Sequence, residues 1–269
     1  MTLRVRAARP DAHDYAAFVQ FWHELGLDDH PPHPRDQWDE HLCPSTLFLE
    51  AEDGRLAAYG LSFPFGDRGD VRQIVVGSAF RRQGVGRQIM AAVAARLRAA
   101  GCTNWRLEVR AENAAAIALY RSVGMEVVHA IHIVYLSRAD AERFAATRSG
   151  RHEVTVVDPA DDAMLEARFD LGRGQIARWR TFRGHCPILH VGDRALTQVW
   201  RDFEPGKGLL FPFRAVDGDV AAHLMAVAPP MPEQVGVYVV DEPVLDALVA
   251  AGATRHEEQL EMGGPLPNA

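Results

Sequence analysis

The chain has 269 residues, of which 24% are charged and 48% belong to the hydrophobic set, an ordinary composition for a globular protein. Its formal net charge of −7 argues against a general nucleic-acid-binding protein. No apolar run approaches the ~20 residues that a membrane span needs, and the first residues contain no apolar signal core. The length suits one large domain or two modest ones.

The three cysteines, Cys43, Cys102 and Cys186, are odd in number and far apart in the sequence. They show neither a metal-ligand spacing nor the pattern of a disulfide framework. We therefore predict a cytoplasmic protein without a metal and without nucleic-acid or membrane partners.

Hydrophobic periodicity predicts an α/β arrangement in the first half of the chain. In chain order we expect a strand at 3–8, helices at 10–27 and 37–42, strands at 46–52, 55–63 and 70–76, a helix at 84–100, a strand at 104–110, a helix at 113–123 and a strand region at 125–136. Short turns join the strands between 46 and 76, so these strands are expected to be antiparallel.

A polar stretch at 139–151 predicts a linker, which divides the chain into domains at 1–138 and 152–269. After the linker the pattern begins again. We expect a strand at 152–157, a helix at 161–182, strands at 187–191, 196–203 and 209–215, a helix at 219–227, a strand at 235–240, a helix at 243–251 and a strand at 255–261. A tail rich in glycine and proline at 263–267 predicts a frayed end.

The last short helix of each half aligns with the other without gaps. Asn113 falls on Asp241 and Gly124 falls on Gly252, an offset of 128 residues. This offset is about half the chain and indicates an internal duplication. Sequence identity between the halves is low, so a chance similarity of two α/β units is the alternative.

Residues 75–87 form the sharpest motif, because they follow a predicted strand and open a predicted helix. A helix start presents unpaired N–H groups and a positive dipole end, which suit a diphosphate. Gly84 and Gly86 let the backbone approach such a ligand. Positive charge is added by three arginines, Arg81, Arg82 and Arg87. The alternative is a solvated basic turn in front of a helix.

Other nucleotide-binding motifs fit the sequence less well. A Walker loop requires Gly-Lys-Ser/Thr, whereas Gly206-Lys207-Gly208 lacks the hydroxyl residue. A dinucleotide fingerprint requires a third glycine, and Ile89 occupies that position.

Two stretches resemble the GNAT superfamily of N-acetyltransferases. They are Arg81-Arg82-Gln83-Gly84-Val85-Gly86 and Asn113-Ala114-Ala115-Ala116-Ile117-Ala118-Leu119-Tyr120, closed by Gly124. Residues 107–120 are especially similar to the bacterial enzymes that acetylate the N-terminal amine of a ribosomal protein. The resemblance is strong over 71–128, topological over 3–65 and faint over 152–261. Ser78 and Met125 stand where proline and phenylalanine are usual, and neither position contributes a ligand-binding group in the family.

The resemblance implies an α/β fold of two GNAT-like domains, each a mixed, largely antiparallel sheet flanked by helices, with the second domain degenerate. Two central strands of the first sheet, 71–76 and 104–110, are expected to splay apart. The resemblance also implies acetyl-CoA as the cosubstrate, with its pantetheine arm in the splay. The implied cofactor-binding residues are Ile74, Val75, Val76, Arg81, Arg82, Gln83, Gly84, Val85, Gly86, Arg87, Asn113, Ala116 and Tyr120.

Acylation of an amine needs a neutral amine, a polarised thioester and a proton for the leaving thiolate. By resemblance, Tyr120 is the general acid and Glu108 is the base. Plain core packing is the alternative for Tyr120. For Glu108 the alternatives are a solvated or ion-paired carboxylate, with a water relayed from another carboxylate as the base. Asn113 is expected to cap its helix and, as in the family, to contact the cofactor.

The second half has no counterpart of the Arg-Arg-Gln-Gly-x-Gly motif, and Leu248 replaces Tyr120. We therefore predict one acyl-CoA site per chain. The predicted activity is acetyl-CoA-dependent acetylation of a primary amine by direct attack, with a small molecule or a protein N-terminus as the acceptor. The alternatives are a non-catalytic acyl-CoA-binding regulatory module and a tandem acetyltransferase resembling mycothiol synthase.

Overall fold

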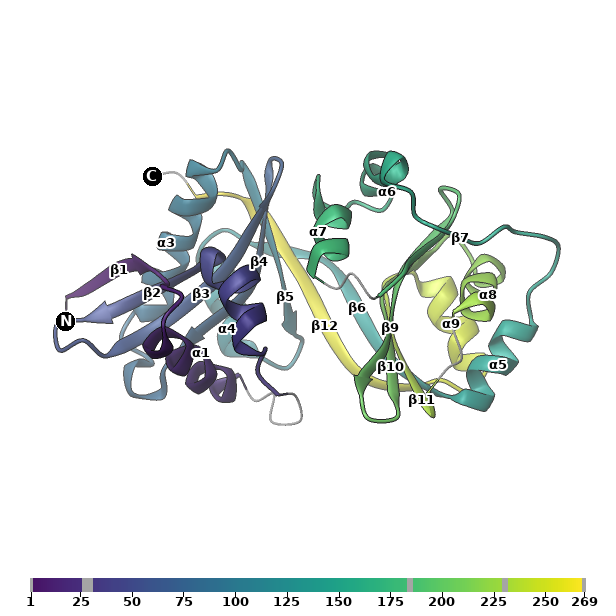
Figure 1. The fold of residues 1–269 in the computed structure, drawn as a ribbon, viewed down its shortest axis with the longest axis horizontal. Helices are drawn as coiled ribbons and strands as arrows, with labels where there is room; N and C mark the ends of the chain where they lie inside the picture. Colours follow the sequence, from purple (N-terminus) through teal and green to yellow (C-terminus); the bar gives the residue numbers. More distant parts are fainter. Residues whose placement is uncertain (1, 26–30, 183–185, 229–231, 268–269) are drawn as a thin grey trace. The chain divides into compact units, whose positions relative to one another are not determined.

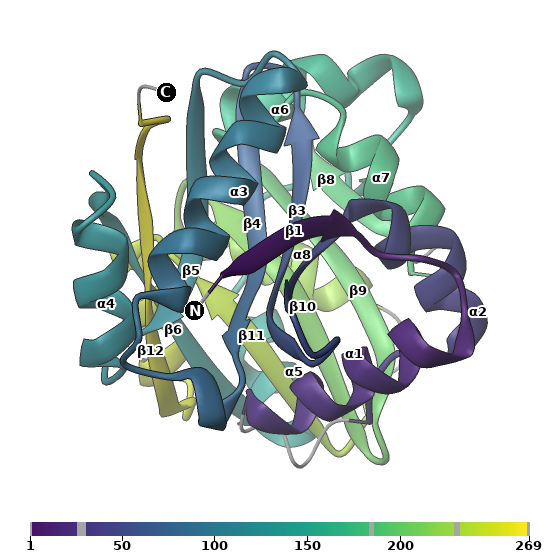
Figure 2. The same ribbon diagram turned by 90° about the vertical axis from the view of Figure 1, so that its left-hand side faces the viewer.

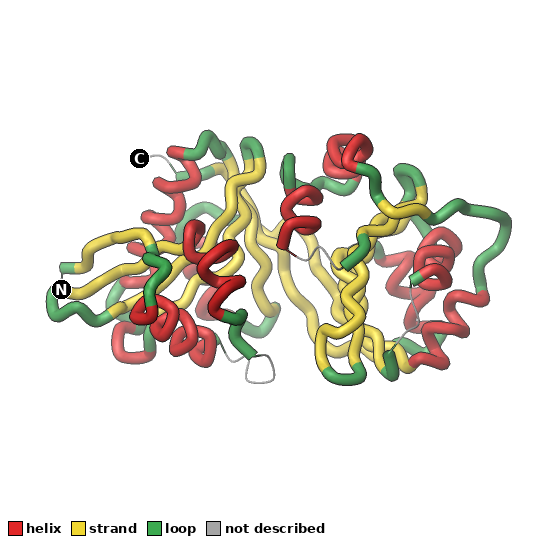
Figure 3. Tube along the Cα trace, in the orientation of Figure 1, coloured by secondary structure: helices red, strands yellow, loops and turns green. Residues whose placement is uncertain are grey.

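The computed structural model describes residues 2–25, 31–182, 186–228 and 232–267 (Figure 1). The chain forms two compact units. The first contains Met1–Val109, Asn113–Val127 and Met262–Ala269, and the second contains Arg110–Glu112 and Val128–Glu261. Both units combine helices with strands (Figure 3). No helix among the described residues is both long and apolar enough to span a membrane.

The first unit is built on a mixed sheet. Its strands are β1 (Leu3–Ala7), β2 (Thr46–Ala51), β3 (Leu56–Phe65), β4 (Arg68–Val76) and β5 (Asn104–Arg110), hydrogen-bonded in that order. Pairing is antiparallel from β1 to β4 and parallel between β4 and β5. The helices are α1 (Ala12–Glu24), α2 (Arg35–Gln37) with a π-helical turn at Trp38–Leu42, α3 (Val85–Ala99) and α4 (Ala114–Arg121).

Helices α1 and α3 cover opposite faces of β3 and β4 (Figure 2). Neighbouring residues of a strand point to opposite faces, and Tyr59 and Gly60 of β3 show the two environments. The Tyr59 ring lies 5.3 Å from the ring of Phe21 on α1. A Cβ atom at Gly60 would lie 2.7 Å from the Val93 side chain of α3. The glycine therefore allows α3 to pack closely on the sheet, and this packing fixes the start of α3 relative to the end of β4.

The second unit repeats this arrangement. Its strands run in the order β7 (Thr155–Val156), β8 (Ile188–Val191), β9 (Ala195–Glu204), β10 (Lys207–Ala215), β11 (Gln234–Val239) and β6 (Glu126–Ser137). Only the β10–β11 pair is parallel among these neighbours. The helices are α5 (Arg138–Ala146), α6 (Asp162–Arg168), α7 (Gln175–Phe182), α8 (Gly218–Val227) and α9 (Glu242–Ala250). Apolar residues of α5, α8 and α9 join the strands in one core.

The backbone supports the predicted duplication. The main-chain N–H of Met125 donates to the Tyr120 carbonyl over 3.1 Å, and that of Ala253 donates to the Leu248 carbonyl over 3.0 Å. The offset between these turns is again 128 residues. Gly124 and Gly252 both have positive φ, at 87° and 112°. The strands that follow, β6 and β12 (Thr254–Pro265), are each 12 residues long.

These two long strands are exchanged between the halves of the sequence. Strand β6 follows α4, yet its residues from His132 to Ser137 pair with β11 in the second unit. Strand β12 follows α9, yet Met262–Ala269 belong to the first unit, where β12 neighbours β5. Each sheet is therefore completed by the last strand of the other half.

The predicted linker at 139–151 differs from the structure, because α5 occupies most of it. Ser137 caps this helix by accepting a hydrogen bond from the Asp140 N–H over 3.1 Å. Ala141, Phe144 and Ala145 are buried in the core of the second unit. Three apolar residues among charged ones are a weak sequence signal for a helix. Contacts with the core of the second unit stabilise the helix.

Two further predictions are wrong. The helix expected at 161–182 is divided into α6 and α7 by a turn in which Asp170 and Gly174 have positive φ. The tail expected to be frayed continues β12 to Pro265, and the Leu266 N–H donates to the Thr103 carbonyl over 2.8 Å. These glycine and proline residues remain in a strand because β12 is hydrogen-bonded to β5 and the chain just after it is bonded to Thr103.

Candidate active site

The parallel pair β4–β5 opens along its length. It is paired from Arg68 opposite Asn104 to Val71 opposite Leu107, and among the described residues no β4–β5 pairing follows. Strand β4 nevertheless continues to Val76, and its other edge remains bonded to β3. The predicted splay is confirmed. It leaves main-chain groups between Ile74 and Val76 facing a gap in the ladder instead of a strand.

The chain turns from the open end of β4 directly into α3. Phe80 is buried and anchors this turn, while the following residues 81–84 are exposed. The N–H groups of Arg87 and Gln88 donate to the Gly84 carbonyl. Within the described part of the chain, the N–H groups of residues 83–86 have no protein acceptor. This helix start can therefore bind an anion through its main chain.

The two glycines of the motif have different structural causes. Gly84 has φ of +78°, and a Cβ atom there would meet nothing within 4 Å, so its backbone conformation explains the residue. At Gly86 a Cβ atom would lie 3.0 Å from Cδ2 of Leu119. Gly86 thus provides the room in which α4 packs against the start of α3, and the same contact brings α4 next to the anion-binding turn.

The three arginines of the motif differ in their partners. Arg81 donates from Nε to the Val76 carbonyl over 3.1 Å and from Nη2 to Glu24 over 2.5 Å. Among the described residues, the exposed side chains of Arg82 and Arg87 have no ion-pair or hydrogen-bond partner. These two cations are therefore available to phosphates, whereas Arg81 braces the turn. Glu24 was not predicted, because a glutamate at a helix end carries no distinctive pattern.

Helix α4 holds Asn113 and Tyr120. The Asn113 side chain accepts a hydrogen bond from the Ala116 N–H over 3.1 Å, which confirms the predicted cap. Tyr120 is only 8% exposed, and burial raises its pKa to about 12. No described residue forms a hydrogen bond with its hydroxyl group. The phenol is therefore protonated at neutral pH and can donate to a ligand.

Glu108 lies on the half-buried face of β5. The strand alternates, with Trp105, Leu107 and Val109 buried and Glu108 between the last two on the other side. Glu108 already interacts with another group of the protein.

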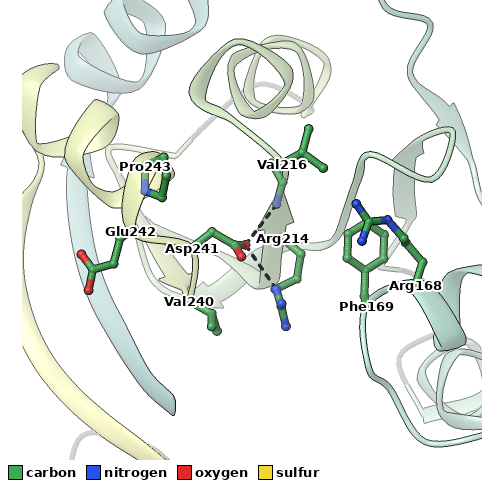
Figure 4. Close-up of a pocket in the computed structure, with 9 residues that line it drawn as sticks. Arg168, Phe169, Arg214, Val216, Val240, Asp241, Glu242 and Pro243 are labelled. Atoms are coloured by element: carbon green, nitrogen blue, oxygen red, sulfur yellow. Dashed lines mark hydrogen bonds and ion pairs between the residues drawn. The ribbon is translucent and has the colours of Figure 1, made fainter. Parts of the chain in front are cut away.

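The second unit offers a cavity of about 530 Å³ at the corresponding place, the end of β10 and the start of α9 (Figure 4). Aspartate side chains accept hydrogen bonds from main-chain N–H groups at this place. Asp241 accepts from the Ala215 N–H over 3.4 Å and pairs with Arg214 Nε at 3.3 Å (Figure 4). Asp217 caps α8 by accepting from the Val220 N–H over 2.9 Å. Carboxylates at both helix starts repel a diphosphate, in contrast to the free turn before α3.

The parallel strands β4 and β5 splay apart beside the start of α3, where main-chain N–H groups have no acceptor among the described residues. An α/β fold with this arrangement can hold an extended anionic ligand. Residues 14–125 match the model of the acetyltransferase (GNAT) family. The chain is 38% identical over 77 residues to the [ribosomal protein bS18]-alanine N-acetyltransferase of Escherichia coli strain K12, which covers 29% of this chain and 52% of that protein. The chain thus spans about half the length of the curated relatives it matches.

Solved structures resemble the whole chain. A putative acetyltransferase from Pyrococcus horikoshii has a TM-score of 0.68 at 17% identity, covering 98% of this chain and 89% of that one. A tandem GNAT protein from the clavulanic acid biosynthesis pathway has a TM-score of 0.63 at 14% identity and covers 100% of both chains. At such identities the likeness shows the fold alone. Residues 14–125 thus resemble the GNAT acetyltransferase family, and the fold of the whole chain resembles that of a tandem GNAT protein.

Proposed function

We propose that the first unit transfers an acetyl group from acetyl-CoA to a primary amine. The observation that carries this proposal is the free helix start at residues 83–86 beside the splay of β4 and β5. Main-chain N–H groups there, with Arg82 and Arg87, would bind the diphosphate. The bound cosubstrate supplies an activated thioester. The open edge of β4 between Ile74 and Val76 would hold the pantetheine arm and polarise the thioester carbonyl.

The proposed chemistry is direct attack by the amine. Glu108, or a water held by it, accepts a proton from the ammonium group so that the neutral amine can react. Tyr120 donates its phenolic proton to the departing thiolate. The buried, protonated phenol and its lack of a partner among the described residues support this role.

The proposed acceptor is an α-amine, either at a protein N-terminus or in a small molecule. An α-amine has a free pKa of about 7.7–8.0, against about 10.4 for lysine, so it needs less help from a base. The relative is named as an N-acetyltransferase of alanine in ribosomal protein bS18. The family model spans residues 14–125, which include the proposed cofactor and catalytic residues, so this likeness supports the chemistry more strongly than the identity of the acceptor.

A thiol-release assay tests the proposal with the full-length protein. Acetyl-CoA is supplied with peptides that have a free N-terminal alanine, with the same peptides blocked at the N-terminus, and with small primary amines. We expect turnover with free α-amines and none with the blocked peptides. Tight acetyl-CoA binding without release of thiol in any arm would instead establish a non-catalytic binding module.

Calorimetry with acetyl-CoA tests the location and number of sites. We expect one site per chain, because the carboxylates of Asp217 and Asp241 interact with the corresponding main chain of the second unit. Arg82→Ala should weaken this binding, since a cation near a phosphate is lost. Two equivalent sites would contradict the assignment to the first unit.

A further inference from the structure

Three potential metal ligands meet in the second unit, outside the candidate active site. His152 precedes β7, and Asp219 and His223 lie on α8. One donor atom from each of these residues lies within 4.8 Å of the others. Asp219 and His223 are four residues apart on one helix face, a spacing that lets two side chains reach the same ion.

The hydrogen bonds of His223 leave one ring nitrogen ready for a metal. Its Nδ1 lies 2.9 Å from the carbonyl oxygen of Asp219. A carbonyl oxygen only accepts, so Nδ1 carries the proton and Nε2 carries the lone pair in the neutral ring. Histidines that bind metals in proteins commonly donate their other N–H group to a backbone carbonyl in this way. The ring is buried, so this orientation is fixed.

His152 presents its Nε2 atom to the same point. This atom lies 3.4 Å from Asp219 Oδ2 and 3.4 Å from Arg194 Nη1. Arginine only donates, so the contact with Arg194 places a lone pair on Nε2. That lone pair then faces a carboxylate oxygen, an arrangement that a bound cation stabilises. Arg194 is itself a competing cation, but it is drawn toward Asp217 at 3.1 Å.

The Asp219 carboxylate is held from its other side. Its Oδ1 atom accepts hydrogen bonds from the Ser149 N–H over 2.5 Å and from the Ser149 hydroxyl over 3.0 Å. Oδ2 is thereby directed toward the histidines. Hydrogen bonds of this kind orient the residues that coordinate a metal directly, and they strengthen metal binding.

We propose that His152, Asp219 and His223 bind one zinc ion per chain. Two imidazole nitrogens and one carboxylate oxygen form a ligand set that suits zinc, with water as the fourth ligand. Zinc–ligand bonds of 2.0–2.2 Å set the edge of a zinc tetrahedron at about 3.3 Å. The His152–Asp219 separation of 3.4 Å already matches this edge. The ion ties the segment after α5 to α8.

Zinc alone is the probe. Full-length protein stripped with a chelator is titrated with zinc in competition with a chromophoric chelator. We expect one zinc per chain with a dissociation constant at or below about 1 μM, equivalent to about −8 kcal/mol. Cobalt in place of zinc should give visible ligand-field absorption without a thiolate band, because none of the three cysteines is in the cluster.

His152→Gln and His223→Gln should each weaken zinc binding at least tenfold, whereas His23→Gln, an exposed histidine of α1, should not. His152 is partly exposed, so His152→Gln is expected to fold. If His223→Gln fails to fold, the zinc affinity of His152→Gln decides the result. The proposal is overturned if the unaltered protein binds no zinc. It is also overturned if folded His152→Gln binds zinc with the original affinity.

Discussion

Tyr120 combines a buried ring with an accessible proton donor. Its ring is buried, yet no described residue accepts or donates a hydrogen bond at its hydroxyl group. The hydroxyl oxygen is not among the fully buried polar atoms that lack a partner in the described part of the chain, so it can donate its proton to a ligand. The same residue can therefore contribute to the core and supply a proton.

Tyr120→Phe should lower kcat by about 10²-fold or more, because general acid catalysis contributes on that scale. The KM for acetyl-CoA and the free energy of unfolding should change little, since the hydroxyl has no described partner. Steady-state kinetics and urea unfolding measure both. Tyr59→Phe is the matched control: it loses a 2.5 Å hydrogen bond to Gln73, so it should lower stability by about 1 kcal/mol and keep turnover.

The pH dependence of kcat follows from the raised pKa of Tyr120. Its folded-state pKa of about 12 lies above the ordinary value of about 10, so folding favours the protonated phenol. The associated stability is complete below pH ~10 and is lost as the pH rises toward 12. We therefore expect no loss of the acid between pH 6 and 10. A decline in that range that disappears in Tyr120→Phe would contradict the raised pKa of Tyr120.

Glu108→Gln should reduce kcat/KM for the amine at pH 7, by about 10²-fold if the carboxylate is the base. The defect should shrink toward pH 9, where an α-amine is already neutral. Glu112→Gln changes an exposed carboxylate four residues away and should have no such effect. Equal activity of the two variants at pH 7 would assign the base to another group.

At the scale of elements, the turn between β4 and α3 gathers the features of an anion site. Gly84 supplies a left-handed backbone conformation, and the helix that follows begins with free N–H groups. The contact between Gly86 and Leu119 joins this turn to α4. The proposed acetyl-CoA site and the position of Tyr120 therefore depend on the same local geometry.

Gly84→Ala should destabilise the fold by about 1–2 kcal/mol, because a left-handed conformation is unfavourable for alanine. Relaxation of the turn should also weaken acetyl-CoA binding about tenfold, as the N–H groups lose their common direction. Gly54→Ala is the control, since Gly54 has φ of +81° and equally open surroundings. It should lose similar stability and bind acetyl-CoA normally, as measured by thermal unfolding and calorimetry.

Local patterns predicted the elements around the site well. The helix cap of Asn113 and the bounds of β5 depend on residues close in sequence, and the structure confirms them. The partners of side chains depend on distant residues. The contacts of Arg81 with Glu24 and of Gly86 with Leu119 therefore could not be predicted from the sequence.

At the scale of the whole molecule, the exchange of β6 and β12 explains why the predicted domain limits differ from the compact units. An alternating sequence pattern predicts that a segment is a strand, but it does not predict which strand pairs with it. The tail at 263–267 was expected to be frayed, whereas Leu266 is buried and its N–H donates to the Thr103 carbonyl in the first unit. Hydrophobicity and turn residues alone could not show this long-range pairing.

Met262→Ala should lower the free energy of unfolding by about 2–5 kcal/mol, the usual range for truncating a buried methionine. Acetyl-CoA-dependent activity should decline in parallel as the population of folded first unit falls. Met164→Ala, at a position that is 42% exposed, should change stability by less than about 0.5 kcal/mol. Chemical denaturation of both variants measures the difference. Equal stability would mean that the C-terminal segment is dispensable.

The exchange also affects how the protein is made. The ribosome synthesises β5 long before Met262–Pro265. Until the second unit has been synthesised, the edge of β5 in the first unit therefore lacks its neighbour β12. Translation that stops early leaves that edge open to other chains. The proposed acetyl-CoA site is thus expected to mature only after β12 has been synthesised.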